Sequence, residues 1–91
     1  MYYTYVLKCF NSKSYKTIFY VGVTSNLEER IKDHKSKSTM YTKSFDIIEL
    51  VYFEACLSKK DAYLREKQLK TGFGRGYVKK RIKNYLNEKR R

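Results

Sequence analysis

Residues 20–34 read YVGVTSNLEERIKDH, and in this stretch a strand pattern gives way directly to a helix pattern. The β-forming residues at its start are followed by two overlapping helix-capping patterns, S-x-x-E from Ser25 and N-x-x-E from Asn26. We therefore expect a strand that ends near Thr24 and a helix that begins shortly after it.

The expected helix carries a polar pair next to its apolar residues. Leu27 and Ile31 are four residues apart, and so are Arg30 and His34, so all four lie on one continuous stripe about 100° wide. Arg30 and His34 thus lie beside the apolar seam instead of opposite it. This placement makes both residues candidates for a functional site.

The segment before this stretch predicts a β-hairpin. β-forming residues dominate Tyr2–Cys9 and Thr17–Thr24, and the polar residues Asn11–Ser14 between them supply a turn. The short connection favours antiparallel pairing of the two strands. Gly22 interrupts the second strand, which indicates a bulge or a close approach to the backbone.

The segment after it predicts a third strand and two further helices. The strand covers Ile47–Glu54, and an S-x-x-D pattern at Ser58 caps a helix that runs to about Lys70, with Gly72 as its stop. The glycine-spaced residues Gly72–Gly76 then form a link to the last helix. The apolar stripe of that helix is Val78, Ile82, Tyr85 and Leu86.

The expected order of elements is β-β-α-β-α-α. It predicts one domain of the α+β class over residues 1–91: a small three-stranded sheet, made of the hairpin and the third strand, flanked by helices. The direction of the third strand is left open because it follows a helix. A domain of this size has a thin core, which the 10 Tyr and 5 Phe help to fill.

The charge of the chain favours a polyanionic partner. Lys and Arg number 21 against 9 Asp and Glu, which gives a formal net charge of +12. The partner could be DNA, RNA or an anionic membrane surface, and the many tyrosines favour nucleic acid. No apolar run approaches the roughly 20 residues needed to span a bilayer, and no signal-peptide pattern opens the chain, so we expect a cytoplasmic protein with no membrane span.

Several other kinds of site are not supported by the sequence. Cys9 and Cys56 come without a secretory signal, which predicts reduced thiols. His34 is the only histidine, which argues against a structural zinc site. The glycines at 72, 74 and 76 neither follow a strand nor lead into a Lys-Ser/Thr ending, so no phosphate-cradling nucleotide loop is expected.

Four residues of the first two strands and the first helix have both a structural and a functional interpretation. Tyr5 and Tyr20 either pack in the core and across strands or direct their hydroxyls to a site at the sheet surface. Arg30 either covers apolar surface with its stem or aims its guanidinium, whose donor fork matches phosphate oxygens, at a scissile phosphate. His34 is either structural or exposed, or it contacts the phosphate or relays a proton.

Glu66 is the most informative acidic residue. It falls with Ala62 and Leu69 on the inward face of a helix that is otherwise flanked by Lys and Arg. It either pairs with Arg65, Lys67 or Lys70, or it is a single carboxylate that holds one Mg²⁺ or Mn²⁺, since such an ion keeps several waters and can also take substrate phosphate oxygens. No other carboxylate pair has metal-ligand spacing.

Taken together, these residues resemble the GIY-YIG nuclease family, and most closely its small stand-alone, single-domain members. The first family triplet corresponds to Tyr3-Thr4-Tyr5, which keeps only the tyrosine, and the second to Tyr20-Val21-Gly22, with Val for Ile. The further segments that resemble the family's Arg-bearing helix, middle segment and metal-binding helix are Gly22–His34, Tyr41-Thr42 with Leu50–Glu54, and Ala62–Lys70.

The resemblance implies a DNA endonuclease that depends on one divalent metal, Mg²⁺ or Mn²⁺, and a structure-selective role in DNA repair or recombination would fit it. Glu66 would hold the metal against a non-bridging phosphate oxygen and the leaving 3′-oxygen. Tyr20, with Tyr5 nearby, would orient or deprotonate the attacking water. Arg30 would stabilise the developing charge, and His34 would be an auxiliary contact.

The DNA backbone is expected to follow basic residues near the end of the chain, which add affinity and salt dependence without choosing a sequence. These residues are Lys70, Arg75, Lys79, Lys80 and Lys83. One alternative is a module of the same fold that binds branched or single-stranded nucleic acid without cutting it. A further alternative is an RNA-associated or partner-recruited structural domain. Either a monomer or a transient homodimer fits the sequence.

Overall fold

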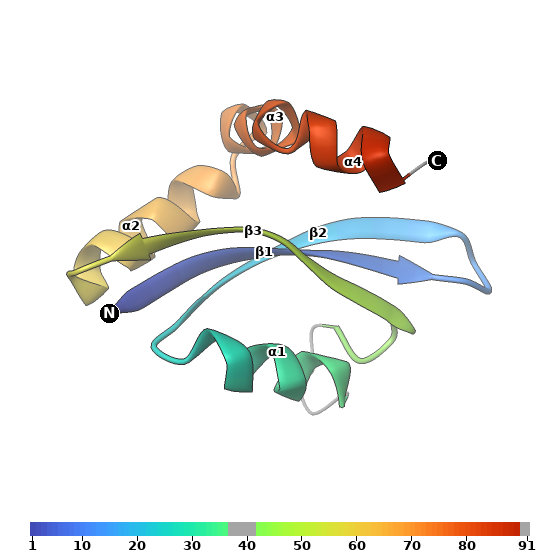
Figure 1. Ribbon diagram of the computed structural model, residues 1–91, viewed down its shortest axis with the longest axis horizontal. Helices are drawn as coiled ribbons and strands as arrows, with labels where there is room; N and C mark the ends of the chain where they lie inside the picture. The colour runs from blue at the N-terminus through green and yellow to red at the C-terminus, as the bar shows by residue number, and fades with distance from the viewer. Residues whose placement is uncertain (37–41, 90–91) are drawn as a thin grey trace.

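The structure is a computed structural model that describes residues 1–36 and 42–89. It contains a three-stranded antiparallel sheet in the order β2-β1-β3, with helices on both faces (Figure 1). Strand β1 covers Tyr2–Asn11, β2 covers Lys16–Thr24 and β3 covers Ile47–Cys56. The predicted α+β class, the hairpin and the third strand are confirmed, and the third strand runs antiparallel to β1.

The central strand β1 divides the core between the two faces of the sheet. Because successive side chains of a strand point to opposite faces, Val6 packs on one side while Tyr5, Leu7 and Cys9 pack on the other. Helix α1, Leu27–Lys35, covers the face of Tyr5. Helices α2, α3 and α4, which are Lys59–Leu69, Gly72–Arg81 and Lys83–Lys89, cover the face of Val6 (Figure 1).

Helix α1 uses the second of its two capping patterns. The side chain of Asn26 accepts a hydrogen bond from the backbone N–H of Glu29 at 3.1 Å, which satisfies one of the donors at the helix start. With the helix fixed in this register, His34 is fully buried against the sheet and Arg30 lies one turn before it. Both side chains meet the sheet, since Arg30 donates a hydrogen bond to Tyr5 of β1.

Helix α2 is tied to the sheet by an ion pair with several hydrogen bonds. Arg65 donates from Nε and Nη2 to the carboxylate of Glu54 on β3 at 2.9–3.0 Å, and Tyr52 donates to the same carboxylate at 2.8 Å. The Arg65 guanidinium also lies 4.9 Å from the ring centre of Tyr77 on α3. Burial opposes ionisation of Glu54, but these hydrogen bonds bring its pKa below the usual value. This network fixes the rotation of α2, and with it the direction of the next residue, Glu66.

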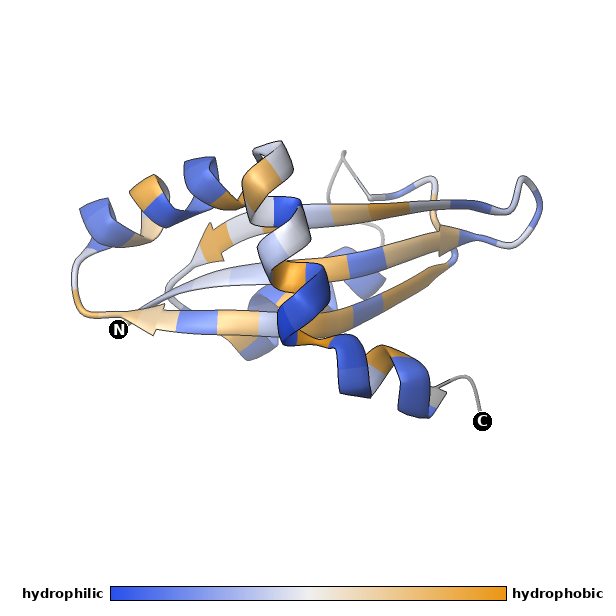
Figure 2. Ribbon diagram, turned by 90° about the horizontal axis from the view of Figure 1, so that it is seen from above, coloured by the Kyte–Doolittle hydropathy of each residue, from blue (hydrophilic) through white to orange (hydrophobic). Residues whose placement is uncertain are grey.

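The interpretation of Gly72–Gly76 as a link is wrong, and so is that of Gly72 as a helix stop. Helix α2 ends at Leu69 without a glycine, and α3 begins at Gly72, where the side chain of Thr71 accepts a hydrogen bond from Gly74 N–H at 3.1 Å. The predicted last helix is also divided, since Ile82 separates α3 from α4. Figure 2 shows α3 crossing over the strands of the sheet.

The close contact of Gly74 with α2 explains why a glycine-rich segment is helical here. A Cβ at position 74 would overlap the carbonyl oxygen of Gln68 and the Cα of Leu69, whereas a Cβ at position 76 would meet nothing within 4 Å. Tertiary packing thus outweighs the low helix propensity of glycine, which is about 1 kcal/mol per residue relative to alanine.

Two alanine substitutions in the same helix should have opposite effects on stability. Gly74→Ala should lower the free energy of unfolding by about 2 kcal/mol or more because the new methyl group meets backbone atoms that cannot turn aside. Gly76→Ala should raise it by about 0.5–1 kcal/mol because the site is open and alanine favours helix. Urea denaturation measures both, and equal effects would contradict the packing of α3 on α2.

The described residues add two facts about the class of protein. None of their helices combines the length and apolarity that crossing a bilayer requires. Cys9 and Cys56 are both free thiols, and burial raises the pKa of Cys9 to about 11, so its thiol packs as a small apolar group.

Candidate active site

The hydroxyl of Tyr5 joins side chains from β1, α1 and the segment after α1. It lies 2.9 Å from His34 Nε2 and accepts a hydrogen bond from Arg30 Nε at 3.3 Å. His34 Nδ1 lies 2.8 Å from the hydroxyl of Thr42. One assignment satisfies every group: Arg30 donates to Tyr5, Tyr5 donates to Nε2, and Nδ1–H donates to Thr42. His34 is neutral in this assignment.

The electrostatics of the buried residues agree with this assignment. Burial lowers the pKa of His34, and the charge of Arg30 lowers it further against the opposing effect of Asp33. Burial also raises the pKa of Tyr5 to about 12, although the hydrogen bond from Arg30 works in the other direction. Both residues are therefore uncharged near neutral pH, and Tyr5 is a donor to His34 and not a base.

The guanidinium of Arg30 has a buried side and an exposed side. Its hydrogen bond with Tyr5 raises its pKa, so it stays charged, and its side chain is 37% exposed. Nη1 lies 3.9 Å from Asp33 Oδ2 in a long ion pair at the surface, which contributes little to stability. The terminal nitrogens can therefore meet an anionic ligand while Nε remains on Tyr5.

Gly22 makes room for the Tyr5 ring. The two residues are paired across β1 and β2, and a Cβ at position 22 would lie 2.5 Å from the Tyr5 hydroxyl oxygen and 2.6 Å from Cζ. The close approach expected at this glycine is therefore present. The irregularity of the sheet lies elsewhere: Val6 pairs with Tyr52 and Leu7 with Leu50, which leaves Val51 as a bulge in β3.

A cleft of about 880 Å³ opens between β2 and the helices α2 and α3, and we call it the β2–α3 cleft. Tyr20 and Glu66 are among its lining residues. The ring centre of Tyr20 lies 5.1 Å from that of His34 and 6.3 Å from that of Tyr5. The negative charge of Glu66 also raises the pKa of Tyr5. The cleft thus lies next to the hydrogen-bonded group around the Tyr5 hydroxyl.

Glu66 is partly shielded and has a cationic neighbour. Its side chain is 19% exposed, and its Oε2 lies 3.5 Å from Nζ of Lys70, whose side chain is 55% exposed. Of the partners expected from sequence, Arg65 is instead held by Glu54. Because the Lys70 side chain is more than half exposed, the pair contributes little, and a divalent cation can compete with the lysine for the carboxylate.

A single carboxylate at this position is compatible with one hard divalent cation. In residues 1–36 and 42–89, no three His, Cys, Asp or Glu side chains gather into a metal-binding group. Mg²⁺ and Mn²⁺ do not need such a group when waters and substrate phosphate oxygens complete their coordination. Glu66, at the wall of a cleft with room for both, fits the ion.

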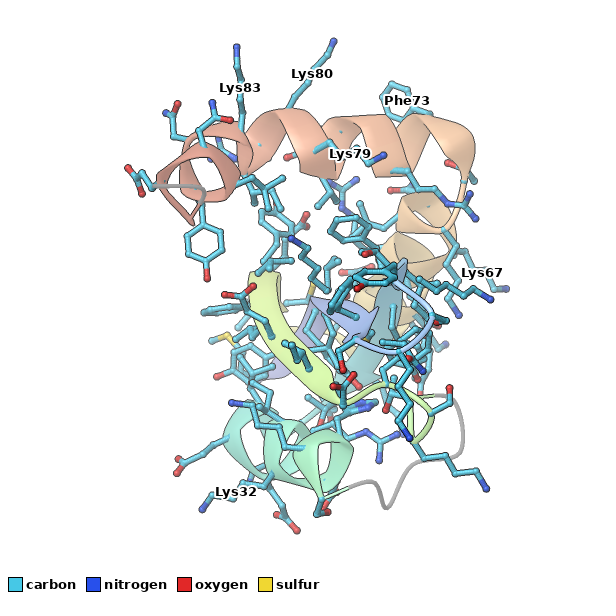
Figure 3. The ribbon with its side chains drawn as sticks, turned by 90° about the vertical axis from the view of Figure 1, so that its right-hand side faces the viewer. Lys32, Lys67, Phe73, Lys79, Lys80 and Lys83 are labelled. Carbon is cyan, nitrogen blue, oxygen red and sulfur yellow. The ribbon has the colours of Figure 1, made fainter. Side chains whose placement is uncertain are left out.

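The basic residues expected to contact DNA fall on two surfaces. Lys70, Arg75 and Lys79 line the β2–α3 cleft. Lys80 and Lys83 extend from the helices on the side away from the sheet, as Figure 3 shows. Arg75 and Lys79 are about one turn apart on α3 and share a face, whereas Lys80 is rotated by about 100° from Lys79.

Comparisons with known proteins identify the family of the chain. A family model described as the GIY-YIG catalytic domain matches residues 1–79.

The chain belongs to the GIY-YIG family.

Small relatives of this GIY-YIG chain carry the name UPF0213 protein. One from Clostridium perfringens (strain 13 / Type A) is 39% identical over 71 residues, which are 77% of this chain and 71% of the relative. One from Staphylococcus haemolyticus (strain JCSC1435) is 39% identical over 70 residues, 76% and 79% of the two chains. The protein YazA of Bacillus subtilis (strain 168) is 31% identical over 87 residues, which are 94% of this chain and 78% of the relative. No solved structure matches the chain.

Sequence reasoning missed one residue of this GIY-YIG site. Thr42 is fully buried and holds the second nitrogen of His34. Thr42 lies in a segment without a helix or strand pattern, so residue spacing did not indicate that it is buried. It was named from the sequence only within the family resemblance. Tyr41, the other residue of that segment, lies outside the described residues.

The buried histidine of the GIY-YIG site predicts a pH dependence of stability. Because its pKa in the folded state is below the ordinary value of about 6.5, the unfolded chain binds the proton first as the pH falls. The contribution of neutral His34 to the free energy of unfolding is complete above about pH 6.5. It is lost as the pH falls toward the lower pKa of the folded state. The free energy of unfolding then falls by no more than about 1.4 kcal/mol per pH unit.

The substitution His34→Gln isolates this contribution. His34 is the only histidine, so between pH 7 and about pH 5.5 no other side chain is expected to titrate from its ordinary pKa. Wild-type protein should lose stability across this range in thermal or urea unfolding, whereas the variant should have a nearly flat profile. The same slope in both proteins would contradict a neutral, buried His34.

Proposed function

We propose that this GIY-YIG domain, over residues 1–91, is a DNA endonuclease that depends on one divalent metal, Mg²⁺ or Mn²⁺. The observation that supports this most is Tyr5, whose hydroxyl accepts a hydrogen bond from Arg30 and whose ring centre lies 6.3 Å from that of Tyr20 at the wall of the cleft. A guanidinium with a donor fork therefore lies near a cleft whose wall carries a partly shielded carboxylate, Glu66, and several basic residues.

Glu66 is the proposed metal ligand. Its exchange from Lys70 to the ion needs only a rearrangement of an exposed lysine. A divalent cation held there by Glu66 would stabilise the negative charge that develops on the reacting phosphate. The carboxylate is carried by a helix that the Arg65–Glu54 pair fixes on the sheet, so its position is set before substrate arrives.

Arg30 is the proposed electrostatic partner of the phosphate. Its terminal nitrogens match the spacing of two phosphate oxygens, and its Nε is held by Tyr5. His34 holds the Tyr5 hydroxyl in turn, and Thr42 holds His34. Tyr5, His34 and Thr42 thus act through Arg30 by orienting it, because their own polar groups are turned toward one another in the interior.

Tyr20 is the proposed contact of the attacking water, since it lines the β2–α3 cleft while Tyr5 is fully buried. The water oxygen forms a bond to phosphorus as the bond to the 3′-oxygen breaks. The water loses a proton, which Tyr20 either orients for transfer to solvent or accepts while it passes its own hydroxyl proton to solvent, and the leaving oxygen gains a proton from solvent. The products are a 5′-phosphate and a 3′-hydroxyl.

The basic residues of the cleft and of the outer face are proposed to bind the DNA backbone. Lys70, Arg75 and Lys79 lie near the reacting phosphate, while Lys80 and Lys83 add a more remote contact. Such contacts give affinity that falls steeply with salt. A cytoplasmic monomer or transient homodimer with a role in DNA repair or recombination agrees with this proposal.

A binding module without cleavage activity is the second candidate. The ion pair of Glu66 with Lys70 supports it, because a carboxylate that stays paired with the lysine would not take a metal. This alternative keeps the same fold and basic surface, and differs only in the absence of metal-dependent turnover.

A cleavage panel separates the two candidates. End-labelled nicked, flapped, branched, plain duplex and single-stranded DNA, with matched RNA, is incubated with the protein in Mg²⁺, Mn²⁺ or EDTA. The proposal expects cleavage of at least one DNA with metal and none in EDTA. Tight, salt-sensitive binding with no cleavage of any substrate would favour the binding module, and preference for RNA would favour an RNA-associated domain.

A further inference from the structure

The β2–α3 cleft is larger than the proposed reaction uses. Tyr20 and Glu66 account for its catalytic end, but its walls continue along Phe19 and Val21 of β2 and along Leu69 and Val78 of α2 and α3. Val21, Leu69 and Val78 are core residues and Phe19 packs partly against them, so this second part of the cleft has a firm apolar floor. A phosphate and a hydrated metal ion are polar, so neither would bind to this apolar surface.

The rim of the same cleft is cationic. Lys70, Arg75 and Lys79 line it, and Glu66 is the one acidic residue among the described lining residues. Nζ of Lys79 lies over the Phe19 ring, 5.9 Å from its centre, so a positive charge stands above the aromatic surface. The ligand that fits this arrangement combines an apolar face with a negative charge.

The β2 wall also offers polar groups to the ligand. In the order β2-β1-β3, β2 is an edge strand, so the backbone N–H and C=O groups on its outer side do not pair with β1. Thr17, an exposed residue of β2, adds a hydroxyl that can donate or accept a hydrogen bond. A flat ligand that displaces the Lys79 side chain and lies on Phe19 would present its edge to these groups.

We infer that the β2–α3 cleft binds the base of an unpaired nucleotide next to the phosphate that is cut. A nucleobase has apolar faces that stack on aromatic rings, a polar edge that forms hydrogen bonds, and an attached phosphate that meets the cationic rim. A volume of about 880 Å³ is within the range of small-molecule sites, which is ample for a base and its sugar. The inference rests on the proposed function in that the base belongs to the DNA substrate.

Binding of an unpaired base in the cleft would determine which DNA structures the protein prefers. A base inside a duplex is stacked and paired, and extruding it costs a few kcal/mol, whereas an unpaired base enters without this cost. The cleft therefore selects DNA in which the nucleotide at the cut is single-stranded, at a flap or gap, or mismatched. Fully paired duplex binds through the backbone contacts alone.

Binding in EDTA tests the inference without cleavage. The probes are a fluorescent thymidine oligomer of about 12 nucleotides and an oligomer of the same length and charge whose central nucleotides are abasic. Wild-type protein should bind the thymidine oligomer at least about tenfold more tightly, since each stacked base adds affinity that the backbone does not supply. Equal affinity for the two oligomers would overturn the inference.

Two variants test whether Phe19 is responsible for the preference for the thymidine oligomer. Phe19→Leu keeps an apolar side chain in the core but removes the aromatic face, and it should reduce the preference to about twofold or less while binding of the abasic oligomer is unchanged. Phe73→Ala is the matched control, because Phe73 is 82% exposed on α3 and extends away from the sheet (Figure 3). It should keep the full preference. Retention of the preference in Phe19→Leu, or its loss in Phe73→Ala, would contradict the placement of the base.

The outcomes of this experiment are distinct from those of the cleavage panel. Because no metal is present, a preference for unpaired bases can be found even if the protein never cuts DNA, and this would leave the cleft assignment intact. Conversely, metal-dependent cleavage with no preference for the base-containing oligomer would support the nuclease and overturn the base pocket.

Discussion

The Glu66→Gln variant is expected to lose metal-dependent DNA cleavage by at least about 100-fold, which is the loss usually seen when one preorganised charge is removed from a transition state. The amide has the shape of the carboxylate but not its charge, so it cannot hold a divalent cation firmly. DNA binding in EDTA should be equal to wild type or slightly tighter, because the change removes a negative charge beside a basic cleft. Single-turnover cleavage with labelled DNA and fluorescence anisotropy measure the two effects.

Glu28→Gln is the matched control for this prediction. Glu28 is also a helical glutamate that faces a lysine four residues away, with Oε1 3.7 Å from Lys32 Nζ, but its side chain is 84% exposed and lies on α1. Its replacement should leave the cleavage rate within about twofold of wild type because an exposed pair of this kind contributes little. Wild-type cleavage by Glu66→Gln would remove the proposed metal ligand from the mechanism.

The Arg30→Ala variant should have a comparably large effect on the chemical step. The guanidinium meets the charge that develops on the phosphate, so its loss is expected to slow cleavage by about 100-fold or more while the metal requirement remains. Arg30→Lys should recover only part of the rate, because the ammonium keeps the charge but lacks the donor fork and the hydrogen bond from Nε to Tyr5. The cleavage rate at saturating DNA is the measurement.

Arg81→Ala controls for the general loss of positive charge. Arg81 is an exposed residue at the end of α3 and is not part of the cleft lining. Its replacement should weaken DNA binding modestly, with a smaller dependence of affinity on salt, and leave the rate at saturation nearly unchanged. If Arg81→Ala and Arg30→Ala slowed the saturated rate equally, Arg30 would have no special role at the phosphate.

The elements governed by local patterns could be predicted from sequence. Alternating β-forming residues gave the hairpin, and the N-x-x-E pattern at Asn26 gave the start of α1. The spacing of Arg30 and His34 placed both beside the apolar seam, and both meet the Tyr5 hydroxyl. These features depend on residues within a few positions of one another, where periodicity and capping chemistry are informative.

The features that depend on long-range packing could not be predicted in the same way. Gly72–Gly76 forms a helix because Gly74 fits against the backbone of Gln68 and Leu69, and this contact has no signature in propensity. The pairing of Arg65 with Glu54, which leaves Glu66 to Lys70, depends on how α2 lies on β3. The division of the basic residues between the cleft and the outer face depends on which side of α3 faces the sheet, since Lys79 and Lys80 lie on the same helix.

Arg30 and Glu66, from helices on opposite faces of the sheet, are proposed to act on the same phosphate. A double-mutant cycle of single-turnover cleavage rates, with wild type, Arg30→Ala, Glu66→Gln and the double variant, tests this most directly. Residues that act as a unit give grossly non-additive losses, so the double variant should cleave within about threefold of the slower single variant. Losses that multiply, or wild-type cleavage by either single variant, would contradict a shared site.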